Sequence, residues 1–454
     1  MAYLLNYNQV RIWLIQNYFK DIPLYTMSFE LNIEGELNLD LFEKSVQFLM
    51  LKNVVLKSNI ILQNNVPTLK INNHSFQLKI YNNVNIEKKM KEIKNQVFDL
   101  ENDLLFNISY FNNQDIQKIL LCFSDIIIDG KSMYTFMDDL KCIYNNFINN
   151  VIPKIKTSNY YTNLNHSNDI NSINNIYKIG CYNNTFPIQR EIYSNSENRI
   201  TYIFPNKYYL KIKEYIKKCK ITLFQFLQSI IFILIHKYTN HNNLLIDTIM
   251  DTGVSKTIGL YNNTVMIPCN DFNKNDTIQV FFDKNKCTSR ILLDNRKILL
   301  EKLCSELNFG ELPIIRLHFE FKYKNTSFDF DKCSIYSDFV ENTADTIRQL
   351  IIFNFAELGD VLESYISYKK DCFSENAIKE IRSNMFIIID KIIHNSEISL
   401  KELLDSMEIK TEFNHIYRPK VDYRLLAYKN AGKYPNINYQ NFKEKLDTLF
   451  SNRD

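Results

Sequence analysis

Polar residues suited to chemistry gather in one short segment, residues 124–133, which reads Ser-Asp-Ile-Ile-Ile-Asp-Gly-Lys-Ser-Met. Its two carboxylates, Asp125 and Asp129, flank three isoleucines, and burying a carboxylate is costly unless hydrogen bonds compensate it. Gly130 follows directly and permits a ligand to approach the backbone closely. A simple Asp-Gly turn explains the same letters, so the local sequence leaves both a functional site and a plain turn open.

The elements around this segment predict how it is held. Residues 118–124 form a short apolar run typical of a strand that is buried on both faces. Ser132 is expected to open a helix, since five large side chains follow it at helical spacing: Met133, Phe136, Met137, Leu140 and Tyr144. We interpret this stripe as core packing and not as a cofactor site.

A mixed pattern of helices and strands runs along the whole chain and predicts an α/β (α+β) fold class. In the first half, residues 5–20 and 40–52 have helical patterns, and residues 24–33 between them have a strand pattern. Asp40 is expected to cap the second of these helices, with Glu43 completing a capping box.

The second half repeats the alternation. Residues 206–220 predict a helix, and Thr222 is expected to cap the long apolar helix that follows. Residues 244–250 predict a strand, and residues 314–323 alternate between apolar and charged or polar side chains, as a half-buried strand does. Ser374 is expected to cap a further helix.

A polar stretch rich in Asn and Ser, residues 158–175, predicts a surface linker between two halves. We expect one domain over residues 1–170, which carries the 124–133 segment, and a second over residues 171–454. The tail of the second domain, after about residue 407, has no predicted role.

The composition excludes several classes of protein. With 454 residues and 45% hydrophobic content, the chain can bury a large core in two or three domains. A net charge of +3 gives no electrostatic footprint for nucleic acid. The nine cysteines are odd in number and form no Cys-x-x-Cys pair, which argues for a reducing compartment and against disulfides or a metal site.

No signal peptide or membrane segment is expected. The N-terminus lacks a charged region followed by an apolar run. The most apolar stretch, Leu223–Ile235, is shorter than the roughly 20 residues that cross a bilayer. We therefore expect a cytoplasmic monomer with no nucleic-acid or membrane partner.

The 124–133 segment resembles the HHxxxDG motif of nonribosomal-peptide condensation domains and of the wider CoA-dependent acyltransferase superfamily. Ser124 and Asp125 stand at the two histidine positions. Five further segments resemble family motifs in the family's order: residues 9–13 (Q-x-R-x-W), 39–57 (a helix ending in vLR, here with Lys), 98–106 (FDLxxgPLfR), 258–264 (iGxfxNT) and 368–373 (Yn-x-dLF). The ordered set, over about residues 1–405, carries the resemblance.

The resemblance implies two chloramphenicol-acetyltransferase-like lobes in a V-shaped pseudo-dimer, with the motif at their junction in a tunnel. It implies an enzyme that joins two substrates without a bound cofactor. The donor acyl group would be a thioester on the phosphopantetheine arm of an acyl or peptidyl carrier protein, or on CoA. The candidate site residues are Ser124, Asp125 and Asp129 in the catalytic motif, and Gly130, Ser132, Asn263, Thr264 and His318 along the tunnel.

One departure from the family pattern concerns the base. In the family the second histidine lies next to the attacking amine, and Asp125 stands there. An unperturbed aspartate has a pKa of about 4 and is a weak base at pH 7 unless burial raises that pKa. Among the seven histidines, His318 is the strongest candidate for a replacement base.

A second departure concerns Asp129, which the resemblance implies is structural and paired with an arginine. Pro268 stands where that arginine is expected, so Lys256 or Arg316 is the predicted substitute partner. A buried carboxylate without a partner would be costly.

Heterocyclisation domains, a related branch, also lack the two histidines and carry a DxxxxDxxS pattern. Asp129 and Ser132 match its second Asp and its Ser, but Ser124 stands at its first Asp. Asp125 is displaced by one residue, which on a strand means the opposite face. We therefore do not interpret the chain as a heterocyclase.

Two functions remain open. The first is a free-standing, atypical condensation-type enzyme of natural-product biosynthesis, in which Asp125 orients or deprotonates an amine, hydroxyl or thiol acceptor. The second is a non-enzymatic module whose tunnel holds a carrier arm or stabilises an assembly. A cyclising or dehydrating variant, or an acyltransferase that uses CoA and a small molecule, is a further alternative.

Overall fold

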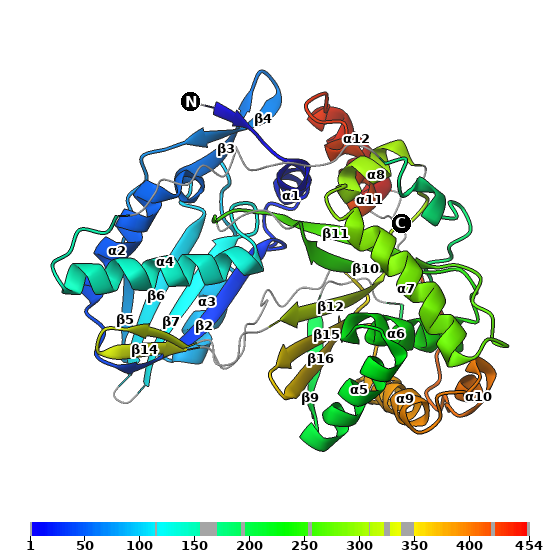
Figure 1. Ribbon diagram of the computed structural model, residues 1–454. Coiled ribbons are helices and arrows are strands. Elements are labelled where there is room, and N and C mark those ends of the chain that lie inside the picture. The colour runs from blue at the N-terminus through cyan, green and yellow to red at the C-terminus, as the bar shows by residue number, and fades with distance from the viewer. Residues whose placement is uncertain are drawn as a thin grey trace.

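The computed structural model describes residues 2–113, 116–154, 170–191, 196–252, 257–307, 309–321, 327–336, 349–418 and 423–451. These residues form two lobes, each built on a six-stranded sheet with helices packed against it (Figure 1). Helix α1 (Tyr7–Tyr18) lies between the lobes. The predicted mixed α/β class is confirmed.

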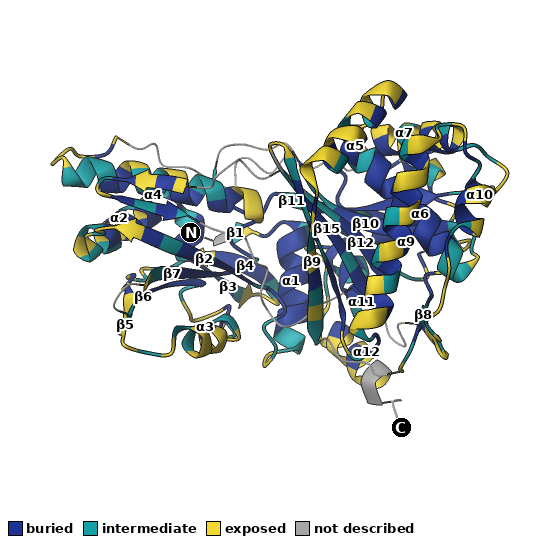
Figure 2. Ribbon diagram, turned by 90° about the horizontal axis from the view of Figure 1, so that it is seen from below, coloured by how far each residue is buried: buried dark blue, intermediate teal, exposed yellow. Residues whose placement is uncertain are grey.

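The first lobe, the N-lobe, has the strand order β13-β14-β2-β7-β6-β5. Its strands are β2 (Thr26–Gly35), β5 (Lys79–Asn82), β6 (Phe106–Asn113), β7 (Ile116–Ser124), β13 (Ser327–Phe330) and β14 (Cys333–Tyr336). Helices α2 (Leu39–Lys52) and α4 (Gly130–Ile148) cover one face of the sheet, and α3 (Ile86–Lys94) lies on the other (Figure 2). Because both faces are covered, the predicted apolar strand is buried over residues 119–124.

A small antiparallel sheet with the order β1-β4-β3 accompanies the N-lobe. It comprises β1 (Ala2–Leu4), β3 (Ser58–Gln63) and β4 (Val66–Ile71), and a short 3-10 helix at Val54–Lys57 leads from α2 into β3. Helix α1 follows β1 almost directly, so this sheet fixes where the chain enters the junction between the lobes.

The second lobe, the C-lobe, has the strand order β11-β10-β12-β15-β16-β9. Its strands are β9 (Glu197–Phe204), β10 (Leu244–Asp251), β11 (Asn262–Cys269), β12 (Ile315–Phe321), β15 (Ile351–Leu358) and β16 (Val361–Lys369). Helices α5 (Asn206–Cys219), α6 (Leu223–Thr239), α7 (Ile278–Asp294) and α9 (Glu375–His394) lie on the side of this sheet away from the N-lobe (Figure 2). Smaller elements are α8 (Leu300–Glu306), α10 (Leu400–Asp405) and the pair β8 (Phe186–Ile188) and β17 (His415–Tyr417).

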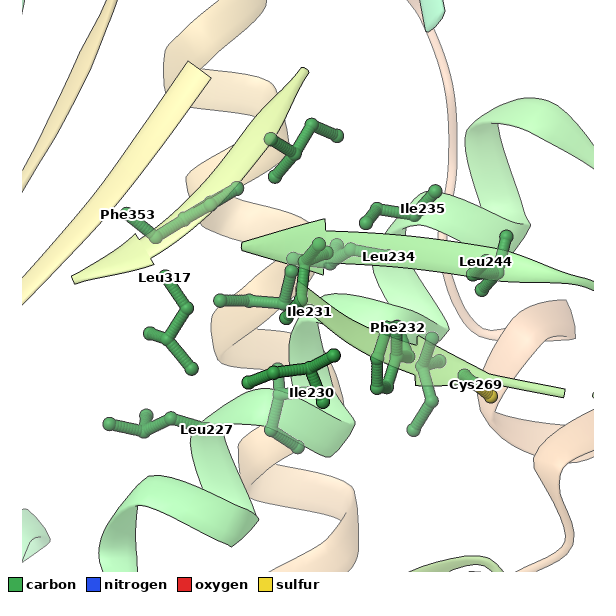
Figure 3. Close-up of a cluster of buried hydrophobic side chains, with 14 of the residues drawn as sticks. Leu227, Ile230, Ile231, Phe232, Leu234, Ile235, Leu244, Cys269, Leu317 and Phe353 are labelled. Atoms are coloured by element: carbon green, nitrogen blue, oxygen red, sulfur yellow. The ribbon is translucent and has the colours of Figure 1, made fainter. Parts of the chain in front are cut away.

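Helix α6 is at the centre of the C-lobe core. Its side chains pack against Leu244 of β10, Cys269 of β11, Leu317 of β12 and Phe353 of β15 (Figure 3). The most apolar stretch of the sequence is therefore a core helix, as its length predicts. Within the described ranges, no single helix is long and apolar enough to cross a membrane; α5 and α6 pass together by composition but meet at 98°.

Three segments from the second half of the chain belong to the N-lobe core. The connection between β10 and β11 contributes Ile258, Leu260 and Tyr261, and the β13–β14 hairpin extends the N-lobe sheet through pairing of β14 with β2. Helices α11 (Tyr423–Ala431) and α12 (Tyr439–Ser451) add the third contribution. The predicted halves, 1–170 and 171–454, thus share a core, and residues 158–169 of the predicted linker lie outside the described residues.

The predicted helix starts at Thr222 and Ser374 are confirmed, since each side chain accepts a hydrogen bond from the amide three residues on. The prediction for Asp40 is wrong. Asn38 caps α2 by accepting from the Leu41 amide at 3.0 Å, and Asp40 lies in the first turn. Both residues are cap-type residues two positions apart, so the letters alone favoured the wrong one.

We expect Asn38→Ala to lower the free energy of unfolding by about 1 kcal/mol, because it removes the acceptor for the Leu41 amide. Asp40→Ala is the matched control: it is also exposed and in the same turn, and should cost about 0.5 kcal/mol or less through the helix dipole. Urea unfolding followed by circular dichroism measures both. A larger loss for Asp40→Ala would contradict the assigned cap.

Candidate functional site

A cavity of about 410 Å³ lies at the junction of the two lobes and is lined by both. The N-lobe contributes the polar side chains of Arg11, Tyr25 and Asp125, and the C-lobe contributes those of Asp247, Arg316 and His318. Apolar side chains such as Ile128 and Leu312 line the same space. The cavity is therefore mixed in polarity, as small-molecule sites generally are.

Asp125 directly follows β7 and lines the cavity, as do Ile128, Asp129 and Gly130 of the same motif. Ser124, the last residue of β7, is 3% exposed and packs within the N-lobe, whereas Asp125 lies on the cavity wall. The backbone amide of Asp125 donates to the carbonyl oxygen of Tyr25 at 2.9 Å, which fixes the start of the motif loop. Ile126, Ile127 and Ile128 are fully buried and hold the loop down in the N-lobe core.

The carboxylate of Asp129 is bonded by three backbone amides from the two lobes. Its Oδ1 accepts from Ser132 N at 2.8 Å, so Asp129 and not Ser132 caps α4. Its Oδ2 accepts from Tyr261 N at 2.8 Å and from Asn262 N at 3.0 Å. Burial raises the pKa of Asp129, and the three amide donors oppose that shift. With both oxygens engaged in this way, Asp129 is suited to joining the lobes.

The predicted partner of Asp129 was an arginine or a lysine, and this prediction is wrong for Arg316. Arg316 forms a bidentate ion pair with Asp247, with both N···O distances at 2.8 Å, and Gln349 Nε2 donates to the same carboxylate at 3.2 Å. Lys256 lies outside the described residues. Backbone amides replace the expected cation, so the carboxylate is compensated by hydrogen bonds.

Ser132, a predicted tunnel residue, has a different place in the structure. Its hydroxyl donates to the carbonyl oxygen of Gly259 at 2.8 Å, and Gly259 N lies 3.2 Å from the same hydroxyl. Ser132 is 3% exposed and therefore ties the start of α4 to the connection between β10 and β11. Gly130, two residues earlier, lines the cavity, and a Cβ there would meet no atom within 4 Å.

Asn263 and Thr264 are adjacent on β11 but have different roles: Asn263 is buried in hydrogen bonds to the backbone, and Thr264 lines the cavity. The Asn263 side chain donates to the carbonyl oxygens of Arg296 and Ile298 and accepts from Leu300 N, so it holds the segment before α8. The side chain of Asn263 is therefore used for these backbone contacts, whereas the sequence predicted it along the tunnel. Thr264, the next residue of β11, lines the cavity.

His318 lies on β12 and lines the cavity from the C-lobe side. Its Nδ1 lies 3.1 Å from Oδ1 of Asn354, whose Nδ2 points to the carbonyl oxygens of Ile352 and Tyr365. Because that amide is oriented by two carbonyls, the Nδ1 of His318 is the donor and the neutral ring has its lone pair on Nε2. The alternation of residues 314–323 contained the signal that placed this histidine.

Helix α1 fastens the motif loop to the C-lobe, a role that the sequence did not reveal. Gln9 Nε2 donates to the carbonyl oxygen of Ile126 at 2.9 Å, and Asn8 Nδ2 donates to that of Asn262 at 2.6 Å. Two residues after Gln9, Arg11 Nε pairs with Glu301 of α8 at 2.6 Å. The Q-x-R-x-W pattern of residues 9–13 signalled Gln9 and Arg11, but their partners are distant in sequence.

An ion pair between Lys131 and Asp251, which also line the cavity, crosses from α4 to the end of β10. The two side chains are 61% and 42% exposed, so the pair contributes little to stability and can separate at low cost. Among the described residues, no group of three or more His, Cys, Asp or Glu side chains is arranged to hold a metal ion.

Several solved domains of peptide-assembly proteins have a fold similar to this two-lobed α/β arrangement. The X-domain from teicoplanin biosynthesis superimposes with a TM-score of 0.77 at 14% identity, covering 89% of this chain and 97% of that one. The starter condensation domain of the rhizomide synthetase RzmA gives 0.72 at 12% identity, covering 90% and 100%. At these identities the likeness shows the fold, and it confirms the two chloramphenicol-acetyltransferase-like lobes.

The family follows from the sequence itself. The Condensation domain model matches residues 1–411, nearly the whole chain, and this chain therefore belongs to the condensation-domain family. Bacitracin synthase 1 of Bacillus licheniformis is 20% identical over 445 residues, which is 90% of this chain and 8% of that protein. Fusarin C synthetase of Gibberella moniliformis is 24% identical over 144 residues, 31% of this chain and 4% of that protein. The chain spans less than a tenth of the length of these relatives.

We expect Asp129→Asn to lower the free energy of unfolding by about 1–3 kcal/mol. Asparagine has an NH₂ group in place of one carboxylate oxygen, so at least one backbone N–H that Asp129 accepts from would lose its acceptor and face another donor. Asp138→Asn is the control, since that exposed carboxylate has only a 3.5 Å contact with Lys141 and should change stability by less than about 0.5 kcal/mol. Chemical denaturation measures both. Equal losses in the two variants would show that Asp129 does not join the lobes in solution.

Proposed function

We propose that this chain is a condensation-type acyltransferase that joins a carrier-bound acyl thioester to a nucleophile in the cavity between the lobes. The observation that carries the proposal is that the two motif carboxylates have different surroundings. Both Asp125 and Asp129 border the cavity, but both oxygens of Asp129 accept from backbone amides that link the lobes. A solved starter condensation domain in complex with C8-CoA supports an acyl thioester as the ligand class.

The reaction needs little covalent help from the protein. The lone pair of the acceptor attacks the thioester carbonyl, the C–S bond breaks, and the pantetheine thiol leaves with the proton that the nucleophile gives up. Asp125 would bind the acceptor N–H or O–H groups and stabilise the positive charge that develops on an amine as it attacks. Holding two reactants in line supplies a large part of the rate enhancement even where the base is weak.

His318 is the second acid–base candidate of the same cavity. Its neutral ring would accept a proton on Nε2, because Nδ1 donates to Asn354. Histidine is the side chain that most often acts as a general base in enzymes. We therefore assign positioning of the acceptor to Asp125 and acceptance of its proton to His318.

Incubation of the protein with an acylated carrier protein and a panel of amine, hydroxyl and thiol acceptors tests this proposal. We expect Asp125→Ala to lower product formation at least about tenfold. This minimum is smaller than the effect usually seen when an acid–base group is removed. Asp138→Asn, on the exposed face of α4, is the matched control and should keep the wild-type rate. Unchanged turnover in Asp125→Ala would remove Asp125 from the mechanism.

We expect His318→Gln to lower the product rate at least about tenfold, because a glutamine side chain cannot accept the proton that the acceptor gives up. Gln keeps an amide donor for Asn354, so the position of β12 is retained. The measurement is the product rate of wild type and variant with the same acceptor. An unchanged rate in His318→Gln would exclude proton transfer through His318.

A second candidate function is a docking module that recruits another enzyme. It is favoured by Asp125 at the motif's histidine position and by the fold likeness to the X-domain, which is recorded in a complex with OxyB from teicoplanin biosynthesis. If the chain is a docking module, the wild-type protein should bind a carrier protein or a partner enzyme but form no product with any acceptor. The acyl-transfer proposal expects product from at least one acceptor in the same assay.

A further inference from the structure

Helix α11 lies beyond residue 411, where the family match ends, yet it is packed into both lobes. Leu425 and Tyr428 belong to the C-lobe core, and Ala427 and Ala431 belong to the N-lobe core. In Figure 1, α11 and α12 (red) lie next to α8 and α1 at the junction. The C-terminal tail, to which the sequence assigned no role, is therefore part of the lobe junction.

The position of α11 is fixed by close contacts at its end and by the residues that follow it. A Cβ at Gly432 would lie 2.2 Å from the carbonyl oxygen of Glu301, so the end of α11 approaches α8 as closely as only glycine allows. The hydroxyl of Tyr434 donates to the carbonyl oxygen of Pro67 at 3.0 Å and accepts from Leu5 N at 3.2 Å. Side chains on α11 therefore have defined places in the junction.

Two side chains of α11, Arg424 and Tyr428, line the cavity. They are four residues apart and so share one face of the helix. Arg424 is 8% exposed and donates from Nη1 to the carbonyl oxygen of Pro313 at 3.3 Å. Tyr428 is 6% exposed and is hydrogen-bonded to the side chain of Thr264, which lines the cavity too.

Tyr428 also connects this wall to the motif. The guanidinium of Arg11 lies 4.7 Å from the centre of the Tyr428 ring, and Arg11 Nη1 donates to the hydroxyl of Tyr25 at 3.2 Å. The carbonyl oxygen of Tyr25 in turn accepts from Asp125 N. Burial raises the pKa of Tyr428 to about 12, so its phenol stays neutral and can donate at physiological pH.

We propose that Arg424 and Tyr428 are specificity-determining residues that bind the distal end of the substrate's acyl chain and select a carboxylate or carbonyl group there over a plain alkyl end. This inference rests on the proposed acyl-thioester function. A guanidinium offers five donors and no acceptor, and it stays charged at any physiological pH. An alkyl end placed against a guanidinium forms no hydrogen bond with it, whereas a carboxylate forms charge-assisted hydrogen bonds.

Two soluble probes of equal chain length test the proposal: octanoyl-pantetheine and the pantetheine monothioester of octanedioic acid, which carries a terminal carboxylate. Isothermal titration calorimetry measures the dissociation constant of each for the wild-type protein. We expect the carboxylate probe to bind at least about tenfold more tightly, the usual scale of a hydrogen bond to a charged group. Arg424→Gln should abolish that preference, and Tyr428→Phe should reduce it a few-fold.

Lys429→Gln is the matched control, because it removes a cation from the same helix whose amino group donates to the carbonyl oxygen of Phe309. This variant should keep the wild-type preference, and circular dichroism with thermal melting verifies that each variant is folded. Arg424→Lys keeps the charge without the planar fork and should show an intermediate preference. It serves as the second variant if Arg424→Gln does not fold.

The outcomes separate the two proposals. If the wild type binds neither probe, the proposed acyl-thioester function fails, and this inference fails with it. If the wild type binds both probes equally, or prefers the octanoyl probe, the thioester function stands and the selectivity assigned to α11 is overturned. A carboxylate preference that persists in both Arg424 variants also overturns it.

Discussion

A carboxylate buried between two lobes has to be compensated where it lies, and this requirement governs the arrangement around Asp129. One oxygen accepts from the first turn of α4, and the other accepts from two amides of the connection between β10 and β11. Removing any of these donors leaves a desolvated charge, which is far more costly than the net gain from an ordinary hydrogen bond. The end of β7, the start of α4 and the edge of the C-lobe sheet are thereby held at one point, and the cavity wall with Asp125 is built next to it.

A second set of contacts, from α1, keeps the junction from opening on its other side. Asn8 and Gln9 bind backbone carbonyls on the two sides of the junction, and the ion pair between Arg11 and Glu301 continues the connection to α8. Glu301 is fully buried, so the pair resists solvent screening better than the exposed pair of Lys131 and Asp251. The junction is therefore firm around the motif and softer near Lys131 and Asp251.

The sequence predicted what depends on local periodicity and motif order. The apolar stripe of α4, the buried strand β7 and the caps at Thr222 and Ser374 follow from nearest neighbours along the chain, and all are present. The ordered motifs also predicted the family and the two lobes.

The sequence could not predict partners supplied by distant backbone. Asp129 is bonded by amides about 130 residues away, and an amide leaves no trace in the choice of side chain. The same limit explains Asn263, whose polar side chain satisfies carbonyl groups and not a ligand. The sequence did not predict a role for the C-terminal tail, because the apolar residues of α11 contact two different cores and so do not repeat with a single helical period.

The pairing of β14 with β2 has a consequence for how the protein is made. Ser334 lies opposite Glu34, so the sheet of the first lobe cannot be completed until the ribosome has synthesised most of the second. In the interval the outer side of β2 presents unpaired amide and carbonyl groups, which is the surface through which strands of separate molecules associate. Production of this chain should therefore be sensitive to the pace of translation and to chaperone supply, and any scheme that exchanges its lobes between relatives has to carry the hairpin 327–336 with the first lobe.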